Sequence, residues 1–440
     1  MKTVILDDDP TGTQSASNVP VLLATSTALL TSALASHDSV YVLTNSRAID
    51  EPSAVSLVAR IREEALASGA ALGEEVQFVL RGDSTLRGHV FAETSVFLDE
   101  DPSAVMVFVP AFPDGGRTTI DGVHYVSVGG VAHPAHETEF ADDPVFPFST
   151  SRLVDYVASK SGRAGIPFAL AELRAGASAP VSGAVAAAAQ DADAGGGLAS
   201  LLLSAPDGSV VVPDAETNDD IRLIAAAITS ARAAGRSIVV RSASPLAAAL
   251  AGVESTGLLA TPLLPAPVDT LLVCGSHTAG ATAQLAEVER LWGAFSVIDT
   301  EQALAEPAAE GLRAAGDARP QLASRSLAVV TTERVRSSSH NTLDHGERVM
   351  TALTTAVRSL LPDVGVVVSK GGITSADVAR IGLGATSVTV LGQVLPGISV
   401  WRLTAADGRS LLYVVVPGNV GDPHTLVQVL EALGLHPTAA

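Results

Sequence analysis

Residues 365–382 read GVVVSKGGITSADVARIG, an apolar run that stops at Lys370 and two glycines before a helical pattern begins. Strand, glycine turn and helix in this order are typical of layered α/β proteins. Glycines let phosphate oxygens approach backbone N–H groups, and the start of a helix adds a favourable field. We therefore interpret the segment as a phosphate cradle, with Lys370 as a point charge and Thr374 and Ser375 as donors. The alternative is purely structural: the glycines only turn the chain, and Thr374 or Ser375 caps the helix.

The same pattern continues on both sides of this segment. Other short apolar runs that end in glycine, hydroxyl or acidic residues are TLLVCGSHT, FSVIDT, LAVVTTE, SVTVLGQVLPG and LLYVVVPGNVGD. In the first half of the chain, buried strands are predicted at residues 3–6, 40–44, 76–80 and 104–110. Between them, an amphipathic helix is predicted from Glu51 to Gly69, with Pro52 in its first turn. This spacing of strands and helices predicts βαβ units and parallel sheets.

The proline-rich segment TPLLPAPVD, residues 261–269, predicts a linker between two domains. We expect a first domain over 1–260 and a second over 270–436. The fold class is then α/β, with two layered domains, mainly parallel sheets and an active site in the cleft between them. Within the first domain, the Ala- and Gly-rich stretch 174–202 fits either a helix with loose ends or a surface insertion.

Composition and charge exclude several classes of protein. Hydrophobic residues make up 47% of the 440 residues and charged residues 17%, which excludes a disordered chain. The formal net charge of -20 argues against a non-specific nucleic-acid binder and against docking to anionic membranes. Cys274 is the only cysteine, so the sequence contains neither a disulfide framework nor a cysteine-based metal site. With no apolar span of membrane length and an acidic start, we expect a cytoplasmic protein.

Three loops that follow predicted strands in the first half carry most of the reactive side chains. They read DDDPTGTQ (7–14), RGDSTLRGH (81–89) and PAFPDGGRTT (110–119). Ligands of open parallel sheets bind at the carboxyl ends of the strands. Together the loops supply arginines that can grip a carboxylate and carboxylates suited to base or metal work. The alternative for each loop taken alone is structural: the aspartates simply cap turns, and Arg81 and Asp83 form a solvated ion pair.

Known nucleotide and metal motifs do not account for these loops. The sequence contains no GxxxxGK[ST] and no GxGxxG after its first strand, and the protein-kinase motifs are missing. The segment HPAHETEF, residues 133–140, lacks the spacing of a zinc site, so we predict no protein-built metal site.

Seven motifs nevertheless occur in the order found in one family. They are DDDPTGTQ, RGDSTLRGH, PAFPDGGRTTIDGVHYV, ETEFADDP, GSHTAGATAQL, SKGGITSADV and PGNVGD. In these motifs the chain resembles the four-carbon acid sugar kinase family, from its first strand to about residue 425. The resemblance implies an acid-sugar-binding domain followed by a nucleotide-binding domain. It also implies ATP-dependent phosphorylation of threonate, erythronate or 3-oxo-tetronate.

The resemblance also assigns residues to the two sites. The sugar-acid site would be lined by Asp8, Asp9, Arg81, Asp83, Ser84 and Arg87. The nucleotide would be held by Ser276, Lys370, Gly371, Gly372, Thr374 and Gly418.

A mechanism follows from the needs of phosphoryl transfer, with Mg²⁺ bridging the phosphates of ATP. We expect Arg81 or Arg87 to clamp the substrate carboxylate. Asp83 is the first candidate for the base and Asp9 the second. Lys370 would steady the phosphates, and the two domains would close about the linker.

One departure from the family pattern keeps other functions open. A lysine commonly precedes the family's final glycine motif, whereas Val416 and Pro417 precede Gly418 and Asn419 here. This change fits a subgroup with another substrate, or a sugar-acid sensor without catalysis. A third possibility is another α/β enzyme acting on sugar acids, an oxidoreductase or an aldolase-like protein. The identity of the sugar acid, the hydroxyl phosphorylated and the oligomeric state are open, although a homodimer is common at this size.

Overall fold

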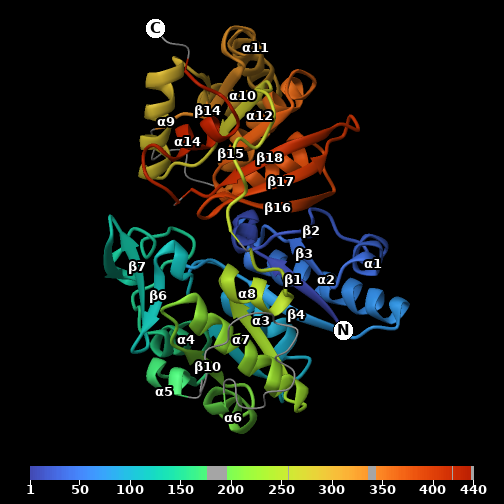
Figure 1. Ribbon diagram of the computed structural model, residues 1–440, viewed down its shortest axis with the longest axis vertical. Coiled ribbons are helices and arrows are strands. Elements are labelled where there is room, and N and C mark those ends of the chain that lie inside the picture. Colours follow the sequence, from blue (N-terminus) through green and yellow to red (C-terminus); the bar gives the residue numbers. More distant parts are fainter. Residues whose placement is uncertain (176–195, 256, 335–342, 419, 438–440) are drawn as a thin grey trace. The chain divides into compact units, whose positions relative to one another are not determined.

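The computed structural model describes residues 1–175, 196–255, 257–334, 343–418 and 420–437. The chain divides into two compact units. Unit 1 comprises Met1–Val19 and Thr25–Glu254, and unit 2 comprises Pro20–Ala24 and Ser255–Ala440. Each unit is a layered α/β structure built on a mainly parallel sheet, as predicted (Figure 1). None of the helices in the described ranges is long and apolar enough to cross a bilayer.

Unit 1 is built on a parallel sheet. In spatial order its strands are β3 (Ser39–Leu43), β1 (Lys2–Asp7), β4 (Val76–Arg81), β11 (Ile238–Ser242), β5 (Val105–Val109), β10 (Val210–Pro213) and β9 (Gly165–Phe168). Its helices are α1 (Thr27–Ser36), α2 (Glu51–Leu72), α3 (Val90–Leu98), α4 (Leu153–Ser161), α5 (Leu170–Ala175), α6 (Gly196–Ser204), α7 (Asn218–Ala233) and α8 (Ser244–Ala251). A small antiparallel sheet consists of β6 (Arg117–Ile120), β7 (Val123–Val128) and β8 (Val131–Pro134). Because parallel strands point the same way, the ends of β1, β4, β11 and β5 meet at one edge of the main sheet.

The predicted end of α2 is wrong by one turn. The helix begins after Asp50, whose side chain accepts the Ser53 N–H, and it continues through Gly69 to Leu72. Gly73 ends it with φ of 69°, a left-handed conformation that favours glycine. Gly69 instead serves packing, because a Cβ there would lie 2.5 Å from Cγ2 of Val76. A glycine inside a helical pattern can therefore mark a close contact rather than a stop. Of the Ala- and Gly-rich stretch, residues 176–195 lie outside the described residues.

Unit 2 combines parallel and antiparallel strands. In spatial order they are β13 (Ser296–Ile298), β14 (Leu327–Thr332), β12 (Thr270–Cys274), β15 (Val366–Lys370), β18 (Ser410–Val416), β17 (Ile398–Thr404) and β16 (Ser387–Leu395). The ladders from β13 to β18 are parallel, and those joining β18, β17 and β16 are antiparallel. Its helices are α9 (Ala279–Trp292), α10 (Thr300–Ala305), α11 (Pro307–Arg325), α12 (Leu343–Leu360), α13 (Gly372–Asp377) and α14 (Thr425–Ala432). The sequence reading did not anticipate β17 or the antiparallel hairpins that it forms.

The central strands of unit 2 are mostly apolar because both faces of the sheet are covered. One face packs against α9 and α14, which lie side by side (Figure 1), through Leu272, Val368 and Val414. Side chains alternate along a strand, so the intervening residues face the opposite layer, where α11 and α12 pack together. The segment predicted as a linker, residues 261–269, lies within unit 2. There the N–H of Leu263 donates to the carbonyl of Ala432.

Candidate functional site

Three consecutive aspartates at the end of β1 form the centre of the first cluster. Asp7, Asp8 and Asp9 are 0, 1 and 5% exposed. Buried carboxylates lose hydration and repel one another, so they require nearby cations or protons.

Arg81, the last residue of β4, supplies one of these cations. The parallel register places Asp7 directly beside Arg81. Nη1 of Arg81 lies 3.1 Å from Oδ1 of Asp7 and 3.5 Å from Oδ1 of Asp8. The structure thus brings Asp8 and Arg81 together, while their contact with a ligand stays a prediction.

Arg241, near the end of β11, supplies a second cation that the sequence reading missed. It is 1% exposed, and its Nη2 lies 3.0 Å from Oδ2 of Asp8. Its Nη1 pairs with Glu93, in the first turn of α3. Gly82 leaves room for it, since a Cβ there would lie 2.5 Å from the guanidinium of Arg241. The available signal was its position at the end of a predicted strand in SIVVRSASP, the same signal that identified Arg81.

Arg47, which the sequence reading also missed, joins the aspartates to the next loop. It follows β3 and pairs with Asp9. It also lies 3.7 Å from carboxylate oxygens of both Asp8 and Asp83. One guanidinium therefore links both candidates for the catalytic base.

The loop RGDSTLRGH is held rigidly around Asp83. Nε of Arg87 donates to Oδ2 of Asp83 at 2.8 Å, and the Thr85 hydroxyl donates to the same oxygen. The carbonyl of Ser84 accepts from Nε2 of His124 at 2.8 Å. Leu86 has φ of 68°, a conformation that is costly for a residue with a branched apolar side chain. Strain of this kind persists only where the surroundings enforce it, and it marks the turn that carries Asp83, Ser84 and Arg87.

The carboxylates of this cluster differ in their affinity for protons. Burial raises the pKa of Asp7 to about 7, against the opposing effect of Arg81. Burial also raises the pKa of Asp8, although Arg47 and Arg241 oppose it. For Asp83 burial is outweighed by Arg87 and Arg47, which hold its pKa well below the usual range. Asp83 is therefore ionised at neutral pH and is a weak base in the absence of a ligand.

The second cluster lies at strand ends of unit 2 and is built from glycines. Gly371 follows β15 with φ of 112°, and a Cβ there would lie 3.0 Å from Cβ of Ser276. A Cβ on Gly418 would lie 2.9 Å from Oγ of Ser276. A Cβ on Gly275 would lie 2.4 Å from Oγ1 of Thr374. The loops after β12, β15 and β18 thus approach one another closely. A contact of their backbone with phosphate stays a prediction.

Lys370 contributes hydrogen bonds within this second cluster. Its side chain is fully buried, and Nζ donates to the carbonyls of Pro417 at 2.7 Å and Val420 at 3.3 Å. Burial lowers its pKa to about 8. The contact with phosphate that the sequence predicts stays a prediction. The contacts present tie the end of β15 to the loop before α14, where Asn419 lies outside the described residues.

The hydroxyls near Gly371 divide between two roles. Oγ of Ser375 donates to the carbonyl of Gly371 at 2.7 Å, so it stabilises the turn rather than facing outward. Thr278 donates to the carbonyl of Gly418 at 2.7 Å and caps α9 through the N–H of Ala281. Arg334, which the sequence reading missed, donates to the carbonyl of Ser276 and is a cation beside this cluster.

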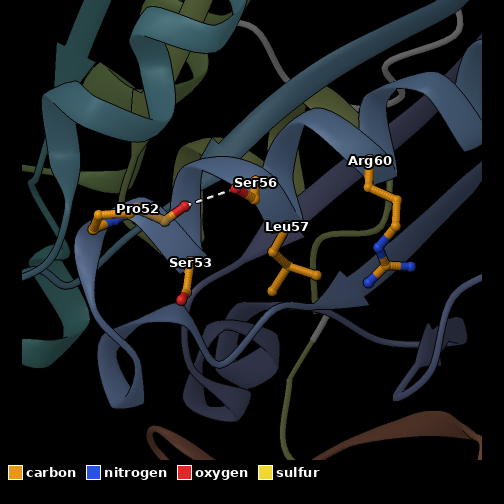
Figure 2. Close-up of a pocket in the computed structure, with 5 residues that line it drawn as sticks. All are labelled: Pro52, Ser53, Ser56, Leu57 and Arg60. Atoms are coloured by element: carbon orange, nitrogen blue, oxygen red, sulfur yellow. Dashed lines mark hydrogen bonds between the residues drawn. The ribbon is translucent and has the colours of Figure 1, made fainter.

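Neither cluster is a ready-made metal site. Within the described ranges, His, Cys, Asp and Glu side chains nowhere gather in threes around a position fit for a metal ion. The aspartates of the first cluster are instead paired with arginines. A hollow along α2 is lined by Pro52, Ser53, Ser56, Leu57 and Arg60 (Figure 2). None of these residues belongs to either cluster, and the Ser56 hydroxyl bonds the Pro52 carbonyl within the helix.

Comparisons with known proteins agree with this division of the chain. Residues 3–250 match the family model of a sugar-binding N-terminal domain, and residues 271–426 match that of a nucleotide-binding C-terminal domain. A D-erythronate kinase from Heliobacterium modesticaldum is 28% identical over 405 residues, which cover 88% of this chain and 84% of that protein. A D-threonate kinase from Bordetella bronchiseptica is 27% identical over 406 residues, covering 89 and 85%.

A solved structure shows the same fold. A protein of Haemophilus influenzae superposes with a TM-score of 0.60 at 18% identity, covering 98% of this chain and all of that one. The order of the seven motifs, the two family models and the long alignments all agree. The chain therefore belongs to the four-carbon acid sugar kinase family.

Proposed function

We propose that the protein is an ATP-dependent kinase that phosphorylates a hydroxyl of a small sugar acid of the threonate, erythronate or 3-oxo-tetronate type. The observation that carries this proposal is the separation of two chemistries onto two units. Unit 1 collects arginines and carboxylates at the ends of β1, β4 and β11. Unit 2 collects glycines and hydroxyls at the ends of β12, β15 and β18. The names of the relatives, D-erythronate kinase and D-threonate kinase, support the same reaction class.

The first cluster would bind the sugar acid and accept its proton. Asp83 is the first candidate for this role and Asp9 the second, with Arg47 lying between them. A depressed pKa does not exclude Asp83. The transition state of phosphoryl transfer is loose, so positioning and charge stabilisation matter more than the strength of the base. Ser84 and the arginines would orient the sugar hydroxyls.

The second cluster would hold the nucleotide. The backbone N–H of Gly372, the Ser276 and Thr374 hydroxyls and the bare backbone at Gly418 would suit phosphate oxygens. The N–H of Gly371 already donates to the carbonyl of Val416 at 2.9 Å, so Gly371 would contribute its lack of a side chain rather than a donor. Lys370 would fix the loop at Pro417, and Arg334 adds positive charge near Ser276. Mg²⁺ bound through the phosphates would neutralise charge that develops during transfer, as in other kinases. Transfer requires the reacting atoms to approach to about 3–3.5 Å. The two units would therefore have to bring the sugar and the nucleotide together.

The first test is a coupled assay of ADP release with Mg-ATP and a panel of acids. The panel contains D-threonate, D- and L-erythronate, 3-oxo-tetronates and branched analogues. We expect turnover with at least one acid and little ATP hydrolysis without it. Binding of ATP without turnover of any acid would favour the sensor instead. Absence of ATP binding would show that the glycine cluster has been misread.

The base is tested separately. Asp83→Asn keeps the shape of the side chain but removes its charge, and we expect kcat to fall by roughly 10²–10⁴-fold. Turnover within a few-fold of the wild type would transfer the role to Asp9.

A further inference from the structure

Among the described arginines around the first cluster, Arg117 differs from the others in having no ion pair. Each of the other arginines near the first cluster has a carboxylate oxygen within 4.0 Å: Arg47, Arg81, Arg87 and Arg241. Arg117 is 6% exposed, and among the residues that the structure describes no carboxylate lies within that distance of it. A buried cation without a counterion is costly, so its retention calls for an explanation.

The surroundings of Arg117 do not supply a substitute for the counterion. Its Nη1 donates to the carbonyl of Gly115, and its Nε finds no hydrogen-bond partner in the described part of the chain. Burial lowers its pKa, and the charges that act on it are those of Asp83 and Arg87. Those two residues bind each other. Arg117 therefore stands beside the Asp83 turn with hydrogen-bonding capacity left over.

The turn before Arg117 fixes its position. Phe112 and Arg117 exchange two backbone hydrogen bonds of 2.8 and 2.9 Å. A Cβ on Gly115 would lie 2.4 Å from the Phe112 ring and 3.1 Å from Nη1 of Arg117. Gly116 has φ of 73°. The two glycines thus allow a tight turn at the end of β5, with the guanidinium placed before any ligand arrives.

Neighbouring His124 does not share the positive charge. It is fully buried, and burial lowers its pKa to about 4, so it is neutral at pH 7. Because the Ser84 carbonyl can only accept, Nε2 carries the proton and Nδ1 accepts from the Thr119 hydroxyl at 3.1 Å. Both ring nitrogens are thereby occupied within the protein. The charge left for an anion at this point is that of Arg117.

We propose that Arg117 binds the carboxylate of the substrate and thereby selects sugar acids over the corresponding neutral polyols. The inference rests on the proposed function, because it takes the ligand of unit 1 to be a sugar acid. A guanidinium presents paired donors that match the two oxygens of a carboxylate. Arg81 is engaged by Asp7 and Asp8, and Arg87 by Asp83. A substrate carboxylate would have to compete with those aspartates, whereas at Arg117 it completes an unpaired charge.

The test compares acid and polyol pairs in binding experiments without ATP. Calorimetry measures the Kd of D-erythronate against erythritol and of D-threonate against D-threitol. The proteins are the wild type, Arg117→Gln, Arg117→Lys and the control Arg222→Gln. Arg222 is an exposed arginine of α7 that pairs with Asp219 and Glu254. We expect Arg117→Gln to raise the Kd of the acid by about 10–100-fold and that of the polyol by less than about 3-fold. Arg117→Lys should retain part of the preference, and Arg222→Gln all of it.

A purely structural role for Arg117 predicts different results. Removal of a buried, unpaired charge should leave the melting temperature of the ligand-free protein unchanged or higher, whereas loss of a structural cation would lower it. The inference is overturned if Arg117→Gln weakens the binding of the acid and of the polyol equally, or if it weakens the binding of neither. It is also overturned if the wild type shows no preference for acids. Should Arg117→Gln fail to fold, a full acid preference in Arg117→Lys with a lowered melting temperature would overturn it too.

ADP release separates the two proposals. Acid binding that depends on Arg117 without turnover contradicts only the kinase, and turnover with an intact acid preference in Arg117→Gln contradicts only this inference.

Discussion

Under the proposed function, both clusters would bind an anion in an acidic protein, but they are built from different kinds of residue. The cluster of unit 1 is dense in charge, with Asp8 in contact with Arg81 and Arg241 and close to Arg47. The cluster of unit 2 is built from glycines, hydroxyls and carbonyls, and its buried lysine is used internally. A net charge of -20 disfavours any anion at long range. Local donors must overcome that field. In the proposed function, unit 1 would do so with arginine side chains and unit 2 with glycine backbone and hydroxyls.

This difference determines how each cluster should fail. A charge network is sensitive to the removal of one member, because the remaining charges are left buried and unpaired. A glycine cradle is sensitive to the addition of atoms, because its function depends on close approach. Substitutions of each kind should therefore separate the two clusters in stability, pH dependence and ligand affinity.

The largest effect is expected for Asp8→Ala, which removes the carboxylate shared by the buried arginines. We expect the free energy of unfolding to fall by about 3–5 kcal/mol, because Arg81 and Arg241 lose a partner at 3.5 and 3.0 Å. Urea denaturation measures it, and Asp219→Ala, which removes an exposed ion pair with Arg222, is the control. A loss equal to that of the control would mean that the network does not depend on Asp8.

Next in size is a pH effect that originates in the aspartate cluster of unit 1. Asp7 has a pKa of about 7 when folded and an ordinary value of 3.8. Between these values the folded state keeps a proton that the unfolded chain releases, so stability falls as pH rises from about 4 to about 7. Asp7→Asn cannot titrate and should lack this loss. Relative to the wild type, the variant should gain roughly 3 kcal/mol between about pH 4.5 and about pH 8. A difference between the two proteins that is independent of pH would contradict the assignment.

The same contrast explains how much could be predicted from sequence. Strand positions, the two-unit α/β fold and the strand-end loops follow from apolar runs and glycine punctuation, which are local properties. Arg81 and Asp8 can be predicted because they lie in motif loops that directly follow predicted strands. Arg47 and Arg241 stand at comparable places, but their partners come from β1 and α3, and that pairing depends on strand order. Neither a fixed spacing nor a sequence motif reports strand order.

Buried polar contacts were harder to predict still. The position of Lys370 between a strand and two glycines favours a phosphate ligand when read locally. Its two carbonyl partners belong to a loop about fifty residues away, and the parallel register of β15 and β18 brings that loop alongside. Similarly, the helical pattern predicts an end at Gly69. The reason for this glycine is its contact with Val76, a residue outside the helix, which the helical pattern does not report. For Gly69 tertiary packing overrides the local interpretation. For Lys370 the packing adds contacts that the local pattern does not report, and its contact with phosphate stays a prediction.

The third test removes the lysine of the second cluster. Lys370→Met keeps the length of the side chain but leaves the Pro417 carbonyl without its ammonium donor. We expect the free energy of unfolding to fall by about 1–3 kcal/mol and ATP binding to weaken by roughly 10-fold, with the affinity for the sugar acid unchanged. Lys160→Met is a matched control, because Nζ of Lys160 also donates to a carbonyl, that of Pro147, but at an exposed position. If Lys370 contacts phosphate instead, ATP affinity should fall without any loss of stability.

The smallest effect, and the sharpest comparison, is the addition of one methyl group to the glycine cradle. Gly371 and Gly408 both have positive φ, 112 and 82°, so alanine strains the backbone at either position. We expect each substitution to lower the free energy of unfolding by about 1–2 kcal/mol. Only at Gly371 does the new Cβ approach the cluster, 3.0 Å from Cβ of Ser276, whereas the space around Gly408 is open within 4 Å.

Nucleotide binding should therefore separate the two variants. We expect Gly371→Ala to raise the Kd of ATP by roughly 10-fold in calorimetry, and Gly408→Ala to leave it within about 2-fold of the wild type. The Kd of the sugar acid should not change in either variant, because in the proposed function the acid is bound by the charged side chains of unit 1. Equal effects of the two variants on ATP would mean that Gly371 only turns the chain. That result would support the structural reading of SKGGITS, and the phosphate site of unit 2 would then have to lie elsewhere.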